Sequence, residues 1–124
     1  MKKITILLFV ATLLAAQNIQ AQTDTLPCPT IVLSAPAEYK ITEGKEAVFT
    51  VEPFSKAYEQ YRLTYNWTVN IGSISKGQGT NTVYIDTKGL RGQAITVTVE
   101  LGGLKSNCLN VKSSTIDIVE GKLH

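Results

Sequence analysis

The sequence predicts an all-β protein, folded as an antiparallel two-sheet sandwich of about seven strands. Short segments in which every second residue is apolar follow one another along the chain, and a strand with this pattern has one buried face. Breaks that contain glycine separate these segments, because glycine adopts turn conformations that other residues resist. After the first 21 residues, no window of 11 or more residues has sustained helical periodicity. We therefore expect the apolar faces to be buried between two sheets.

The clearest strand covers residues 63–70. Its four large apolar side chains alternate with threonine and asparagine, so they share one face; they are Leu63, Tyr65, Trp67 and Val69. Tyr65 and Trp67 are predicted to anchor the core, in preference to a sugar-stacking role for Trp67. The full set of predicted strands is 31–34, 39–42, 47–52, 63–70, 83–87, 95–101 and 111–119.

Two local irregularities are expected. Val111 and Ile116 have opposite parity within one predicted strand, which indicates a bulge or bend near Ser113 and Ser114. Residues 53–62 form the longest irregular connection and are expected to hold a short helical turn.

The first 21 residues have the pattern of a signal peptide. Lys2 and Lys3 precede an apolar run from Ile4 to Ala16, and a polar stretch then ends in the small residue Ala21. This apolar run is too short for a helix that spans the roughly 30 Å hydrocarbon core of a bilayer. We expect cleavage near Ala21, no membrane span in the mature chain, and a product that is secreted, periplasmic or at the cell surface. Residues 22–124 then form a single domain.

The charge balance excludes one class of partner. Two of the 12 basic residues lie in the leader, so the mature chain carries 10 basic and 10 acidic residues. Its arginines, Arg62 and Arg91, are isolated, whereas nucleic-acid binding depends on clustered positive charge. We expect no nucleic-acid partner.

Cys28 and Cys108 lie near the two ends of the mature domain. An exported chain enters an oxidising compartment, so a structural disulfide is predicted. The alternative, a metal site or a catalytic thiol pair, lacks partners, because His124 is the single histidine and a tetrahedral zinc site needs more ligands. No run of acidic residues resembles a calcium loop. No metal or other cofactor is expected.

Several of these segments resemble the PKD-like, immunoglobulin-like domains of exported bacterial proteins. The resemblance covers residues 28–119 and rests on a Tyr-x-Trp strand (Tyr65, Trp67), a glycine turn after it (Gly72), and a later Thr-Val-Thr-Val strand (residues 96–99). The central Trp-Asp-Phe-Gly-Asp-Gly motif of ordinary PKD domains is absent, because residues 68–71 separate Trp67 from Gly72 and both aspartates are missing. The resemblance implies an immunoglobulin-like sandwich, and it implies little about function, because such folds have many unrelated roles.

The sequence lacks the combinations of side chains that common catalytic sites require. Without a second histidine or a reactive cysteine, the usual pairs of nucleophile and base are not available. A glycosidase needs two carboxylates across a cleft. Glu43 and Glu46 bracket a turn, while Asp86 and Glu100 lie on different predicted strands. We expect that the protein is not an enzyme.

The predicted function is therefore that of an exported interaction or structural module, with a protein or polysaccharide of the cell envelope as partner. Its binding surface is expected at an edge strand or at the turns around Gly44, 76–79 and 88–92. The alternative is a carbohydrate-binding module, which requires exposed, coplanar aromatic side chains. Tyr58, Tyr61 and Tyr84 are the candidates for an exposed aromatic surface in either case.

Overall fold

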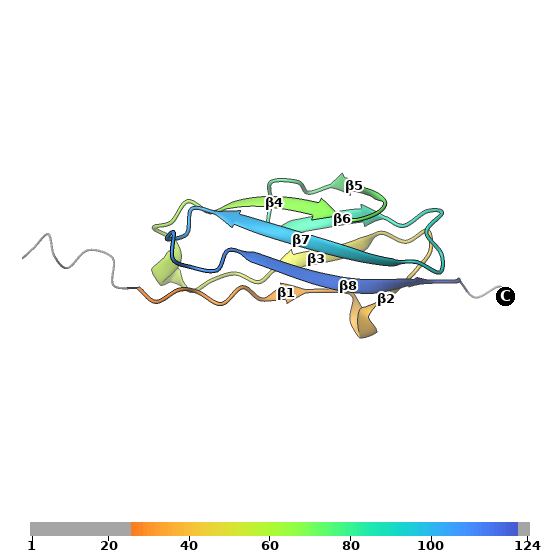
Figure 1. Cartoon of the computed structure of the whole chain (residues 1–124), viewed down its shortest axis with the longest axis horizontal. Coiled ribbons are helices and arrows are strands. Elements are labelled where there is room, and N and C mark those ends of the chain that lie inside the picture. The colour runs from red at the N-terminus through yellow and green to blue at the C-terminus, as the bar shows by residue number, and fades with distance from the viewer. Residues whose placement is uncertain (1–25, 122–124) are drawn as a thin grey trace, which may run out of the picture.

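Two four-stranded sheets pack face to face in the computed structural model, which describes residues 26–121 (Figure 1). One sheet contains, in spatial order, β1 (Leu33–Ser34), β3 (Ala47–Val51), β6 (Thr82–Asp86) and β5 (Ser73–Lys76). The other contains β2 (Lys40–Thr42), β8 (Val111–Val119), β7 (Ala94–Gly102) and β4 (Thr64–Val69). Helix is confined, within this range, to the 3-10 turns η1 (Ala37–Tyr39) and η2 (Lys56–Tyr58). The predicted all-β, two-sheet architecture is confirmed.

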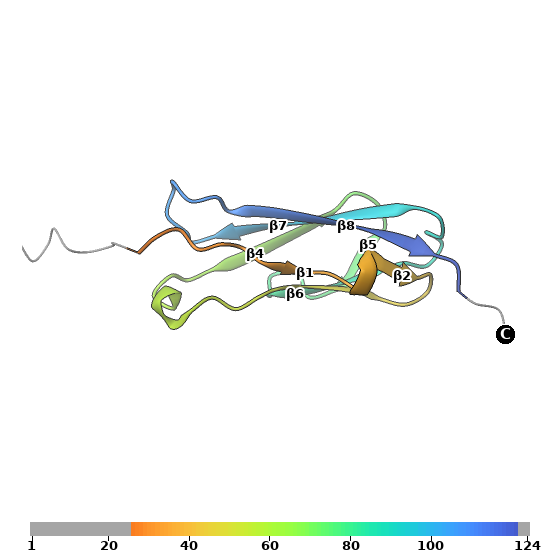
Figure 2. The ribbon, with the colours of Figure 1, turned by 90° about the horizontal axis from the view of Figure 1, so that it is seen from below.

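The described range contains eight strands, one more than expected, and one of the pairings is parallel. The additional strand, β5, has the sequence Ser-Ile-Ser-Lys and lies at a sheet edge, where a single apolar residue is enough. The parallel pair joins β2 to β8. The chain passes from β1 in one sheet to β2 in the other without reversing direction, so β2 runs alongside β8 in the same sense (Figure 2).

The core lies between the two sheets and follows the predicted alternation. In β7, the four buried side chains are Ile95, Val97, Val99 and Leu101. In β4, Trp67 is only 1% exposed, whereas Tyr65 is half-buried and packs at the margin of the core. The opposing sheet contributes Ala47, Phe49, Val51, Val83 and Ile85, all buried. Period-two alternation thus places one apolar face of each long strand in a shared core.

The predicted bulge near Ser113 and Ser114 is wrong. β8 keeps an unbroken antiparallel register with β7, from Ala94 opposite Asp117 to Glu100 opposite Val111. The parity argument assumed that Val111 is buried, but its side chain is 40% exposed. The irregularity lies instead in β5, where the pairing with β6 shifts between Ile74 and Lys76.

The ends of the sandwich differ. At the disulfide end, the N-terminal segment meets the β3–β4 connection and the β7–β8 turn, whereas the turns before β3 and β7 lie at the opposite end (Figures 1 and 2). Cys28 and Cys108, 80 residues apart in sequence, are disulfide-bonded with Cα atoms 5.4 Å apart. The bond fixes the entering chain to the β7–β8 turn. The predicted signal peptide and His124 lie outside the described residues.

Replacing both cysteines by serine (Cys28→Ser with Cys108→Ser) should lower the free energy of unfolding by about 4 kcal/mol, because the bond closes a loop of 80 residues and restricts the unfolded chain. Urea denaturation followed by tryptophan fluorescence measures the change, since Trp67 is buried in the core. The oxidised wild-type protein is the reference, and its reduced form should match the double variant. A loss below about 1 kcal/mol would contradict a stabilising role for the bond.

Candidate functional site

The three turns predicted as a binding surface do not form a single one. The Gly44 turn and the 88–92 turn contact each other at one end of the sandwich, which we call the Gly89 end. The 76–79 turn instead lies against β4, because the side chain of Gln78 bonds to the backbone of Trp67. Only two of the three turns can therefore contribute to one surface.

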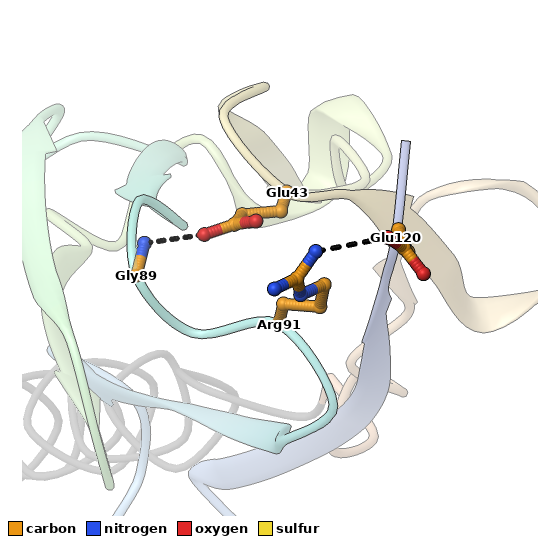
Figure 3. A network of polar contacts seen from close by, with 4 residues as sticks. All are labelled: Glu43, Gly89, Arg91 and Glu120. Carbon is orange, nitrogen blue, oxygen red and sulfur yellow. Dashed lines mark hydrogen bonds and ion pairs between the residues drawn. The ribbon is translucent and has the colours of Figure 1, made fainter. Parts of the chain in front are cut away.

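The Gly89 end is organised by a buried threonine. Thr87 is fully buried, and its Oγ1 donates to the carbonyl of Lys45 (2.6 Å) and accepts from the N–H of Gly44 (3.0 Å). The carboxylate of Glu43 accepts the N–H of Gly89 at 2.8 Å (Figure 3). Two turns distant in sequence are thus joined by side-chain bonds to backbone groups.

A shallow pocket lies beside this network. It has a volume of about 610 Å³ and is lined by residues 91–93 and 117–120. Arg91 reaches across it to Glu120, with 3.0 Å between Nη1 and Oε1 (Figure 3). Both side chains are more than half exposed, at 57% and 61%. An ion pair so open to water contributes little to stability, so this pocket is a polar, solvated surface.

Three of the four carboxylates considered for a hydrolytic pair hold turns or neighbouring side chains instead. Glu43 holds the turn at Gly89, and Asp86 accepts the N–H of Lys88 at 3.0 Å. Glu46 accepts a hydrogen bond from the hydroxyl of Ser75. Within residues 26–121, no three His, Cys, Asp or Glu side chains are grouped closely enough to hold a metal ion.

The predicted aromatic surface is not a flat, open one. Tyr58 lies between Phe54 and Tyr61, with ring centroids 6.2 and 6.1 Å apart and the rings tilted by 57° and 34°. Its hydroxyl donates to the carbonyl of Pro27 at 2.7 Å, which ties η2 to the N-terminal segment. Tyr84 lies under the ammonium of Lys76, which is 4.4 Å from the ring centroid. All three predicted tyrosines are half-buried, and no coplanar stacking platform results.

The most exposed apolar side chain of the described residues lies elsewhere. Leu109 is 81% exposed and Val111 is 40% exposed, and both line a groove of about 310 Å³ beside the disulfide. We call this groove, between residues 28–31 and 109–112, the disulfide groove. One signal for this groove is present in the sequence: Val111 and Ile116 have opposite parity within one strand. The opposite parity reflects the exposure of Val111 and not the expected bulge. Tyr39, the most exposed of the described aromatic side chains at 62%, had been placed in a predicted strand.

Comparisons of the chain with family models, with curated proteins and with solved structures find no match. Over the described range, no helix is long and apolar enough to span a membrane. The functional argument therefore depends on the surface features of this chain alone.

Replacing Thr87 by valine should lower the free energy of unfolding by about 1–3 kcal/mol, because the change keeps the shape of the side chain and leaves a backbone N–H and a carbonyl without their partner. Thr87→Ser is the matched control, since it keeps the hydroxyl. Urea denaturation gives the stability, and amide hydrogen exchange at Gly44 reports the turn. Equal stability of Thr87→Val and wild type would show that the hydroxyl does not organise the Gly89 end.

Proposed function

We propose that this chain is an exported, non-enzymatic sandwich of the immunoglobulin-like class, related to PKD-like domains, that acts as an interaction module in the cell envelope or outside the cell. The strand order supports the fold assignment. If β1 and β2 are the two parts of a split first strand, A and A′, the sheets are A-B-E-D and A′-G-F-C. An immunoglobulin-like sandwich divides its strands between two sheets in this way.

The disulfide supports export. Bonds of this kind persist in oxidising compartments and are rare where thiols are kept reduced. Cys28 and Cys108 are bonded, and both cysteines of the chain are used. The signal-peptide pattern of residues 1–21 supports the same route, and Cys28 is the seventh residue after the expected cleavage at Ala21.

The observation that carries the interaction role is the exposed apolar surface at the disulfide groove. Leu109 is almost fully exposed, and it lies next to Val111 and a groove with more apolar than polar lining. Exposed apolar side chains gathered at a concave site are typical of protein-binding surfaces. A carbohydrate module is favoured less, because the tilted and half-buried tyrosines offer no flat stacking face.

The full chain, expressed with its own leader in a bacterial host, should be found in the periplasm or medium as a disulfide-bonded product shortened at Ala21. Mass spectrometry with and without reductant measures both the cleavage and the bond. The immobilised product should then retain a protein from envelope extracts, and Leu109→Asp should reduce the retained amount. The matched surface control is Arg91→Asp. Retention of an uncleaved, reduced chain in the cytoplasm would overturn the proposed role, and so would capture of equal amounts of the partner by Leu109→Asp and by this control.

A further inference from the structure

We propose that the outer edge of β8, together with the disulfide groove, binds an extended peptide segment of a partner protein by adding it as a strand. The inference rests on the interaction role proposed above, for which it specifies the site and the class of partner. The occupant is an extended segment with an aliphatic side chain that enters the groove and a carboxylate that faces Lys112.

The first step is the direction of the backbone groups of β8. In an antiparallel pair, alternate residues direct both their N–H and C=O groups toward the neighbouring strand. The N–H of Leu101 donates to the carbonyl of Asn110 at 2.8 Å. The N–H of Ile118 donates to the carbonyl of Gln93 at 2.9 Å. Even-numbered residues of β8 therefore point toward β7, and odd-numbered residues point outward.

The second step is that β2 covers only part of this edge. β2 pairs with residues 117–119 of β8 and no further. Three outward-facing residues, Val111, Ser113 and Thr115, have no strand paired with them among the described residues. Their N–H and C=O groups form a short, regular template for another strand.

The other sheet edges offer less unpaired, regular backbone. At β4, Oε1 of Gln78 accepts the N–H of Trp67 (2.7 Å), and Nε2 of Gln78 donates to the Trp67 carbonyl (2.8 Å), as a neighbouring strand would. The edge strand β5 has a register shift and ends in Lys76, and both features discourage pairing. β1 and β2 are only two and three residues long. β1 leaves residues 47–49 of β3 without a partner at their outer edge, whereas β2 leaves residues 111–116 of β8, so β8 has the longer open stretch.

The third step is the groove at the start of the same edge, where it reaches Val111 and Lys112 of β8. Its far wall is the N-terminal segment from Cys28 to Ile31, which passes beside the start of β8 (Figure 2). The disulfide holds that wall in place. In β-strand addition, backbone bonds provide affinity and side-chain pockets provide specificity. A groove of about 310 Å³ with an apolar lining suits one aliphatic side chain of the added strand.

The charge of Lys112 selects the partner. Lys112 lines the groove and is exposed, and the ion pair found within residues 26–121 joins Arg91 and Glu120 instead. A carboxylate on the added strand would satisfy it. A second copy of this chain fits less well, because pairing two β8 strands around Ser113 would place the two Lys112 side chains diagonally at about 7–8 Å on one face.

The far end of the edge carries an exposed aromatic side chain. Tyr39 directly precedes Lys40, which pairs with Asp117, so it lies at the limit of the open stretch. Glu38 and Tyr39 have φ angles of 59° and 55°, a left-handed backbone conformation that non-glycine residues rarely adopt. Strain of this kind is concentrated at functional sites. Tyr39 is thus placed to contact the end of an added strand.

Ser113→Pro tests the inference, because it removes an outward-facing N–H and leaves the bonds to β7 intact. The matched control is Ser113→Ala. Both variants lose the hydrogen bond between the hydroxyls of Ser113 and Thr98 (2.7 Å), but Ser113→Ala keeps the N–H. The probe is a phage-displayed library of random peptides, selected on the disulfide-bonded exported protein.

Selected peptides should alternate aliphatic and other residues and should include an acid. Ser113→Pro should weaken their binding by about tenfold or more, and Ser113→Ala should stay within about twofold of wild type. Lys112→Glu should reverse the charge preference. Amide exchange at Val111, Ser113 and Thr115 should slow in the complex. Absence of selected peptides, or equal binding to wild type and Ser113→Pro, would overturn the inference.

Two further measurements keep the test decisive. If circular dichroism shows that Ser113→Pro does not fold, selected peptides that are N-methylated at alternate amides replace this variant. One set is methylated at odd-numbered positions and the other at even-numbered positions. Only one set should lose binding, and equal binding of the two sets would overturn the inference. A wild-type dimer in sedimentation that Ser113→Ala preserves and Ser113→Pro loses would assign the edge to a second copy, and would also overturn it.

The outcomes separate this inference from the proposed function. Undiminished capture of the envelope partner by Ser113→Pro would remove the edge as the site and leave the interaction role standing. Edge binding of peptides by a protein that remains uncleaved in the cytoplasm would remove the exported role and leave the edge standing.

Discussion

The fold depends on how Trp67 joins the two sheets. Its ring is almost completely buried, and its indole N–H donates to the carbonyl of Thr80 at 2.7 Å. Trp67 belongs to β4, whereas Thr80 lies in the turn that leads into β6 of the opposite sheet. The side chain of Gln78, in the same turn, accepts the backbone N–H of Trp67 and donates to its carbonyl. One residue therefore fills the core, satisfies its own polar group and fixes the separation of the sheets at that edge.

The sequence was most informative where a strand has one buried face and a polar opposite face. In β4 and β7, the alternation of apolar and polar residues predicted both the strand and its buried face. It did so because successive side chains of a strand point to opposite faces, of which one contacts water. It failed where burial is incomplete. β5 has a single apolar residue, which is too few to form an alternating pattern. Val111 is exposed despite being apolar, so it does not follow the rule that apolar residues are inside.

The candidate sites could be predicted only in part, because they depend on contacts between distant segments. Glycines mark the Gly44 and 88–92 turns in the sequence, but the bond from Gly89 to Glu43 links residues 46 positions apart. No local pattern shows that Tyr58 bonds to Pro27, and this bond is what ties η2 to the N-terminal segment. The bond between Cys28 and Cys108 was predictable, because the chain has only two cysteines and the leader pattern led us to expect an oxidising compartment.

The open edge of β8 arises because the N-terminal segment pairs with a strand in each of the two sheets. Residues 33–34 pair with β3 in one sheet, and residues 40–42 pair with β8 in the other. Because the chain crosses between the sheets only after β1, the first half of β8 has no strand paired with its outer edge. The disulfide then holds the preceding residues next to that edge, where they form the wall of a groove instead of pairing with it. The bond predicted to stabilise the domain thus also shapes the site to which we assign the partner.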